Sequence, residues 1–217
     1  EQEYDNARNE PLLIKPKKDK NKGYSSWFIE TVREDIIRDL LQQGAPVDSF
    51  GVGERLITAR SWPVFGGVYK LVGVEEDGKV VPKIKISENP AKITTPDFKQ
   101  VYRLYDNETG KAIADVMTLH DEEIDDSKPY EIFDPIHTWK KKTVTNFTAK
   151  KLLVKIFENG NQIAKLPELS EIRQYCKEQV ETIWEEVKRF ENPHTYYVDL
   201  SPELWNVKHS LLEKYSK

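Results

Sequence analysis

The sequence predicts a mixed fold of the α+β or α/β class: a helix and short strand, an antiparallel β-rich region, and two closing helices. Three observations predict it. Apolar residues recur at three- and four-residue intervals from Trp27 to Leu41, the spacing of one helical face. Hairpin signals follow in the middle of the chain, and helix-start residues mark its last part. We expect four segments, in order a leader without regular structure, the helix and strand, the β-rich region and the helical pair: 1–31, 32–75, 76–167 and 168–217.

Composition limits the function classes. The 217 residues suffice for one large domain or two small ones, and the net charge of −4 argues against a dominant nucleic-acid face. The single cysteine, Cys176, excludes an intrachain disulfide and is typical of a reducing compartment. No apolar run approaches the roughly 20 residues that span a bilayer, and the N-terminus lacks the apolar core of a signal peptide. We therefore expect a cytoplasmic protein with no nucleic-acid or membrane partner.

The first helix is expected to end at Gly44, because Gly44, Ala45 and Pro46 interrupt the helical pattern. Residues 47–50 then form a short extended stretch that leads into a pair of glycines. Before the helix, a run of five lysines lies between residues 15 and 22, and we interpret it as part of a solvated leader.

The middle of the chain reads as antiparallel sheet. The turn at 75–78 separates strands expected at 68–74 and 80–86, and the turn at 106–110 separates strands at 101–105 and 112–119. Further strands are expected at 131–133 and 152–157, after which Asn159-Gly160 turns the chain back.

Two helices close the chain. Ser170 and Glu171 open the first, which Asn192-Pro193 ends, and Ser201-Pro202 caps the second. The apolar face of the first helix predicts half-burial, so we interpret Cys176 as a small core thiol rather than a nucleophile.

The glycine pair Gly51-Val52-Gly53 is the motif most able to carry chemistry. Backbone N–H groups that point the same way at a helix start form an anion site, and glycine lets a ligand approach the backbone closely. Arg55 would add charge-assisted hydrogen bonds to phosphate, whereas the Glu54 carboxylate would repel it. No Gly-Lys-Ser/Thr follows and no third glycine is present. From spacing alone, a structural turn is the favoured interpretation.

A wider set of blocks resembles the nicotinate phosphoribosyltransferase family. The blocks lie on both sides of the glycine pair and extend over roughly residues 35–217, which makes the resemblance far more specific than the glycines alone. They are 50–53 (FGVG), 56–59 (LITA), 65–72 (FGGVYKLV), 83–87 (KIKIS), 92–94 (KIT), 101–104 (VYRL), 197–201 (YVDLS) and 204–205 (LW).

The resemblance implies a fold and a reaction. The family joins nicotinate to phosphoribosyl pyrophosphate, giving nicotinate mononucleotide, with ATP and Mg²⁺, in NAD salvage. Its active site lies at the mouth of an irregular α/β barrel, where loops after late strands hold phosphate. Residues 32–75 would then be the last barrel helix, strand and phosphate turn.

The resemblance also implies site residues. Gly51 and Gly53, with Arg55 beside them, map onto the turn that binds the 5′-phosphate of the ribose. Many members have threonine where this chain has Glu54. The residues expected near that site are Gly66 and Gly67 on the following turn and Lys85, Ser87, Lys92 and Arg103 in the β region.

The catalytic histidine of the family lies in a part that this chain does not match, and the full enzyme is roughly twice as long, a difference of at least one domain. Of the four histidines here, His120 precedes an acidic run, which is typical of a strand that ends in a solvated loop. We therefore assign no catalytic and no metal residue. The expected partner is the missing N-terminal portion or subunit, with a homodimer as a further expectation. The alternatives are a non-catalytic phosphate- or nucleotide-binding module and an oligomerisation module.

Overall fold

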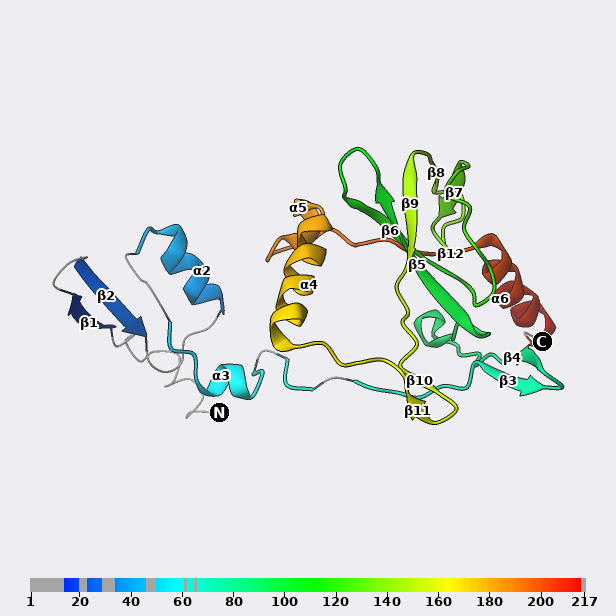
Figure 1. The fold of residues 1–217 in the computed structure, drawn as a ribbon, viewed down its shortest axis with the longest axis horizontal. Helices are drawn as coiled ribbons and strands as arrows, with labels where there is room; N and C mark the ends of the chain where they lie inside the picture. The colour runs from blue at the N-terminus through cyan, green and yellow to red at the C-terminus, as the bar shows by residue number, and fades with distance from the viewer. Residues whose placement is uncertain are drawn as a thin grey trace. The chain divides into compact units, whose positions relative to one another are not determined.

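The computed structural model describes residues 14–19, 23–28, 34–45, 50–60, 62–64 and 66–215. The chain divides into two compact units, Glu1–Val68 and Tyr69–Lys217, and each is described by itself (Figure 1). The mixed α and β composition predicted from the sequence is confirmed. Within the described ranges, no helix combines the length and apolar character needed to cross a membrane.

The first unit begins with a hairpin. Strand β1 (Ile14–Asp19) pairs antiparallel with β2 (Gly23–Phe28), with Ile14 opposite Phe28. The expectation that residues 1–31 lack regular structure is therefore wrong for these two strands. The apolar helical spacing noted from Trp27 does not produce a helix at Trp27 and Phe28, which belong to β2; this strand is rich in aromatic residues, which favour strands.

Two helices complete the described part of this unit. Helix α2 (Glu34–Gln42) ends just before Gly44, whose φ of 72° is the left-handed conformation that stops a helix, as predicted. Of the stretch expected to be extended before the glycines, residues 47–49 lie outside the described residues, and Phe50 is irregular. The short helix α3 (Glu54–Ile57) starts directly after Gly53.

The second unit opens with the first predicted hairpin. Strands β3 (Gly73–Glu76) and β4 (Lys79–Pro82) pair antiparallel around Asp77 and Gly78, both with positive φ, as this turn type requires. Residues 68–72 and 84–86 are not strands, contrary to expectation. The carbonyl of Val72 accepts the N–H groups of Lys83 (2.8 Å) and Asp97 (2.7 Å). Both donors lie in irregular segments outside the strands. The short 3-10 helix η1 (Pro90–Lys92) follows.

A four-stranded sheet forms the centre of this unit, in the order β12-β6-β5-β9. Strands β5 (Lys99–Asp106) and β6 (Ala112–Leu119) confirm the second predicted hairpin. The strand expected at 152–157 lies earlier in the chain: β9 covers Phe147–Lys151, and residues 152–156 are irregular. The edge strand β12 (Val198–Leu200) runs parallel to β6 and was not predicted.

Two smaller hairpins flank the sheet. In the first, β7 (Tyr130–Phe133) was predicted, whereas its partner β8 (Lys141–Val144) was not. In the second, β10 (Phe157–Glu158) pairs with β11 (Asn161–Gln162), and the predicted Asn159-Gly160 turn has positive φ at both residues.

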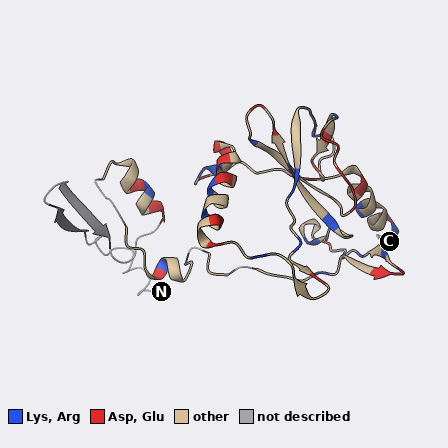
Figure 2. Cartoon of the chain, viewed as in Figure 1, with Lys and Arg blue, Asp and Glu red and all other residues tan. Residues whose placement is uncertain are grey.

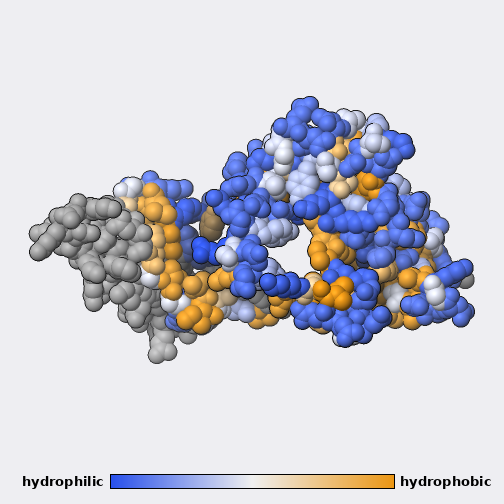
Figure 3. Space-filling model, in the orientation of Figure 1, coloured by the Kyte–Doolittle hydropathy of each residue, from blue (hydrophilic) through white to orange (hydrophobic). Residues whose placement is uncertain are grey.

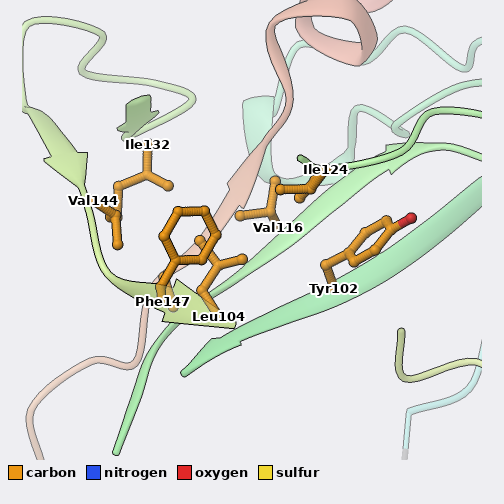
Figure 4. Packing of buried hydrophobic residues seen from close by; sticks show 8 residues of the cluster. Tyr102, Leu104, Val116, Ile124, Ile132, Val144 and Phe147 are labelled. Atoms are coloured by element: carbon orange, nitrogen blue, oxygen red, sulfur yellow. The ribbon is translucent and has the colours of Figure 1, made fainter. Parts of the chain in front are cut away.

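The hydrophobic core lies between the sheet and the β7–β8 hairpin. Side chains from five strands and the loop after β6 point toward one another there (Figure 4). Their apolar burial is the main stabilising term, at about 1.5–3 kcal/mol for a side chain the size of leucine. The core residues are Tyr102, Leu104, Ala114, Val116, Ile124, Ile132, Val144 and Phe147.

The predicted C-terminal helices differ in outcome. Helix α6 (Pro202–Tyr215) is confirmed, and Ser201 Oγ accepts the Leu204 N–H at 3.2 Å, as a cap does. The first helix is shorter than expected: α4 (Leu169–Thr182) ends before Trp184, and a separate turn, α5 (Glu185–Lys188), follows. Trp184 Nε1 donates to the Ala112 carbonyl at 2.9 Å, which ties the break to the sheet. Cys176 is exposed, so its interpretation as a core thiol is wrong.

Candidate functional site

The glycine turn lies in the first unit, immediately before α3. The Leu56 and Ile57 N–H groups donate to the Gly53 carbonyl, at 3.1 and 3.2 Å. The N–H groups of Glu54 and Arg55 precede these bonds, and the first N–H groups of a helix have no acceptor within it. The turn therefore presents backbone donors at the place where the sequence predicted an anion.

Gly53 has open space beside it. Its φ is −100° and its ψ is −109°, a combination outside the α and β regions, and a Cβ built on it meets no atom of the described residues within 4 Å. Open space of this kind is what close approach of a ligand requires. That a phosphate approaches the backbone here stays a prediction.

The neighbouring charges also fit an anion. The carboxylate of Glu54, which seemed to oppose one, lies 3.8 Å from an Arg60 guanidinium nitrogen and is partly neutralised by it. The Nε atom of Arg55 is buried and has no hydrogen-bond partner among the described residues. An unmatched buried donor costs free energy, and an oxyanion would remove that cost.

The positions of the other residues expected near the site do not test whether they contact a ligand. Gly66 and Gly67 lie in an irregular exposed stretch, with open space around both. Lys85 is exposed, and its N–H donates to Thr94 Oγ1 at 2.9 Å. Because Lys85 and Arg103 belong to the second unit, their approach to the glycine turn stays a prediction.

Arg103 already has a partner within its own sheet. Its Nε and one terminal nitrogen donate to the two oxygens of Asp115, at 2.8 and 2.9 Å, and the two residues face each other across β5 and β6. Tyr196 donates its hydroxyl to the same carboxylate at 2.9 Å. The pKa of Arg103 is raised by its bond to Asp115, so the guanidinium stays charged. This geometry favours a structural role for Arg103.

No metal or catalytic cluster emerges from the histidines. In the part of the chain that the structure describes, no three His, Cys, Asp or Glu side chains are grouped so that they could hold a metal ion. His120 stacks on Phe98 with ring centroids 4.0 Å apart, and His209 stacks on Trp205 at 3.6 Å. The Mg²⁺ expected from the resemblance stays a prediction for the intact enzyme.

Sequence reasoning missed a buried acid in the second unit. Asp199, on β12, is 4% exposed, and the described residues give its carboxylate no hydrogen-bond or ion-pair partner. Burial, with a smaller effect of Asp134, raises its pKa to about 6. The sequence signal was Asp199 itself, which lies inside the block 197–201 that resembles the family but received no role there.

Large apolar side chains are uncovered in both units. Figure 3 shows apolar surface over α2 and α3 and, in the second unit, around β10 and β11. Charged residues are spread along α4 (Figure 2), yet the same helix carries exposed apolar side chains. Between residues 153 and 184 of the second unit, the exposed large apolar residues are Leu153, Val154, Ile156, Phe157, Ile163, Leu166, Leu169, Ile172, Tyr175, Val180 and Trp184.

The described residues form an α+β domain preceded by a glycine turn at the start of a short helix. Residues 98–208, half of the chain, match the family model described as the nicotinate phosphoribosyltransferase C-terminal domain. The chain therefore belongs to the nicotinate phosphoribosyltransferase family.

Individual relatives agree with this assignment. The chain is 47% identical over 175 residues to nicotinate phosphoribosyltransferase of Bacillus subtilis, covering 81% of this chain and 36% of the relative. The corresponding Dictyostelium discoideum protein is 33% identical over 188 residues, covering 83% and 31%. The crystal structure of human nicotinic acid phosphoribosyltransferase shares the fold, with a TM-score of 0.62 at 24% identity, over 84% of this chain and 32% of the human chain. The chain thus spans about a third of the length of the relatives it matches.

Proposed function

We propose that this chain is the C-terminal part of a nicotinate phosphoribosyltransferase, the cytoplasmic NAD-salvage enzyme that makes nicotinate mononucleotide from nicotinate, phosphoribosyl pyrophosphate and ATP. The observation that carries the proposal is the match of residues 98–208 to that family's C-terminal domain, together with relatives of that name. In this proposal the first unit contributes the last helix, strand and phosphate turn of the catalytic α/β barrel.

The turn would hold the 5′-phosphate of the ribose. The backbone N–H groups of Glu54 and Arg55, at the start of α3, and the Nε of Arg55 would donate to phosphate oxygens; that Nε has no hydrogen-bond partner among the described residues. Such donors fix the ribose phosphate and so position the carbon that reacts. Lys85 and Arg103 would lie nearby only if the second unit folds back over the turn.

The chemistry would come from elsewhere in the intact enzyme. No residue of this chain is assigned to it, and Mg²⁺ and ATP would be held by the missing N-terminal portion or by a partner subunit. The uncovered apolar residues around α4 support this view, because large apolar side chains left exposed are candidates for an interface. That missing part is the occupant proposed for the α4 surface.

The first test is an assay of the isolated chain with nicotinate, phosphoribosyl pyrophosphate, ATP and Mg²⁺. We expect no nicotinate mononucleotide, because the histidine that accepts the phosphoryl group from ATP in this family is not placed here. Product formed by the pure chain would overturn the division of labour proposed above.

The alternative function is a module that binds a nucleotide without turning it over, which the built turn favours. Calorimetry with nicotinate mononucleotide separates this module from a purely structural or oligomerisation role. We expect binding by the wild type, and at least tenfold weaker binding by Gly51→Val and Gly53→Ala. Gly110→Asn, in a turn of the second unit with φ of 67°, is the matched control because asparagine tolerates that conformation. No binding by the wild type would favour the structural role.

A further inference from the structure

A pocket of about 300 Å³ lies in the second unit, where the β7–β8 hairpin meets the edge of the sheet. Its apolar wall is formed by Ile113 of β6 and by Ile132 and Phe133 of β7. Neighbouring strands β12 and β7 bring Asp199 against the same space. The pocket belongs entirely to residues 113–199 and so involves no residue of the glycine turn.

The deep end of the pocket is acidic. Asp199 lines it, is 4% exposed, and has no hydrogen-bond or ion-pair partner among the described residues. Asp134, which also lines the pocket, is already satisfied: it accepts the N–H groups of Ile136 and His137, both at 2.9 Å. A buried carboxylate without a donor is costly, so Asp199 is the group that a ligand would satisfy.

The rim of the pocket is basic. Lys140, Lys141 and Lys142 line it and are exposed, and among the described residues Lys141 is paired with Glu131 at 2.9 Å. Lys142 also lines an adjoining pocket of about 350 Å³, and Ile113 and Tyr197 are shared between the two. The combined space leaves room for a ligand with an anionic end at the lysines.

The two ends specify one kind of molecule: a hydrogen-bond donor inside, a flat apolar body against Phe133 and Tyr197, and an anion outside. We propose that this pocket binds an adenine nucleotide, with the exocyclic amine donating to Asp199 and the phosphate contacting Lys140 and Lys142. Aromatic side chains favour a planar base, and the carboxylate accepts a hydrogen bond from a base edge that presents an amine.

The test is calorimetry of the whole chain with AMP, with purine riboside 5′-monophosphate, and with adenosine. Purine riboside 5′-monophosphate has a hydrogen atom on carbon where AMP has its amine, so it offers the Asp199 carboxylate no N–H donor at that position. We expect AMP to bind at least tenfold more tightly than this amine-free nucleotide, and adenosine to bind more weakly than AMP because it lacks the anion. Equal binding of AMP and the amine-free nucleotide, or no binding of AMP at millimolar concentration, would overturn the proposal.

A substitution at Asp199 gives a sharper result. Asp199→Asn keeps the size of the side chain but replaces the charged acceptor by a neutral amide, so the preference for AMP over the amine-free nucleotide should shrink. Lys142→Gln should weaken AMP and leave adenosine unchanged, whereas Lys177→Gln on the exposed part of α4 is the matched control and should change neither. If Gly53→Ala abolishes AMP binding while Asp199→Asn does not, the nucleotide binds the glycine turn and the pocket proposal is wrong. Thermal melts without ligand confirm that each variant is folded.

Discussion

At the scale of single residues, two buried acids of the central sheet, Asp115 and Asp199, differ in whether their carboxylates have partners. Asp115 faces Arg103 across β5 and β6 and is satisfied by it and by Tyr196. Asp199 is equally buried, but the described residues leave its carboxylate unmatched. Ionised Asp115 therefore stabilises the fold, whereas burial disfavours the ionised form of Asp199, whose carboxylate is available to a ligand.

Asp199 predicts a pH dependence of stability. Its folded-state pKa of about 6 lies above the value of about 3.9 usual in unfolded chains, so the stability it contributes is fully present below about pH 4 and is lost as the pH rises through 6. The surrounding charges are Asp134, Tyr130 and the lysines at 140–142. Asp199→Asn should therefore stabilise the chain at pH 7, by about 1 kcal/mol, and not at pH 4. Urea unfolding at the two pH values measures this, and a difference that is larger at pH 4 would contradict it.

Replacing Arg103 by lysine is expected to lower the stability of the fold although the positive charge is kept. Its side chain is 18% exposed and that of Asp115 12%, so the pair is largely shielded from water. Arg103→Lys keeps the charge but cannot reproduce the two parallel bonds, and we expect a cost of about 1–2 kcal/mol. Chemical denaturation measures it, with Lys85→Arg as an exposed control. A stability equal to wild type would show that the pair is not structural.

At the scale of elements, the start of α6 depends on one hydroxyl. Ser201 Oγ accepts the Leu204 N–H and donates to Glu122 Oε2 at 2.6 Å, and Ser201 is fully buried. Ser201→Ala should lower the free energy of unfolding by about 1–2 kcal/mol, since it removes a cap and leaves Glu122 short of a donor. Ser210→Ala, on the exposed face of the same helix, is the matched control and should change little. Equal effects of both would contradict the capping role.

In helix α4, exposed apolar residues are expected to matter for assembly with a partner and not for folding of the isolated chain. Its C-terminal end is held by Tyr105, which donates to Gln179 at 3.1 Å, and by Lys111, which donates to the Glu181 carbonyl at 2.7 Å. Ile172 lies nearer its N-terminal end and is 48% exposed, so Ile172→Lys should change the stability of the isolated chain by less than about 0.5 kcal/mol.

The same helix carries a probe for its proposed partner. Cys176 is exposed, so a maleimide should label it readily in the isolated chain and slowly in an assembled enzyme in which α4 is covered. Equal labelling rates in the two forms would remove α4 from the interface.

Local signals were sufficient for some elements and not for others. The β5–β6 hairpin and the cap of α6 were predicted because their sequence determinants lie within a few residues. Strand β12 was missed because it is three residues long and pairs with β6, far away in the sequence. The β1–β2 hairpin was missed because a helical spacing was extended back over aromatic residues that form a strand.

The candidate site shows the same division. Glycine spacing located the turn, and only the family resemblance gave it a phosphate. The partnering of Glu54 by Arg60 needs the folded turn. The Arg103–Asp115 pair follows from hairpin register, which places opposite charges face to face, but the unmatched state of Asp199 depends on a non-local strand.

At the scale of the whole molecule, the chain combines a unit that contains the glycine turn and a domain with its own core. Uncovered apolar residues in both units and coverage of about a third of each relative support the proposed role within a larger enzyme. In that proposal this chain supplies phosphate positioning and architecture, while the rest of the enzyme supplies the chemistry.

The most direct measurement is turnover of a chimera. The chain is joined to the portion of the Bacillus subtilis relative that it does not cover, and ATP-dependent formation of nicotinate mononucleotide is assayed. We expect activity in the chimera, none in the isolated chain, and a loss of at least tenfold with Gly53→Ala but not with Gly110→Asn. A folded chimera without activity, or one indifferent to Gly53→Ala, would contradict the account.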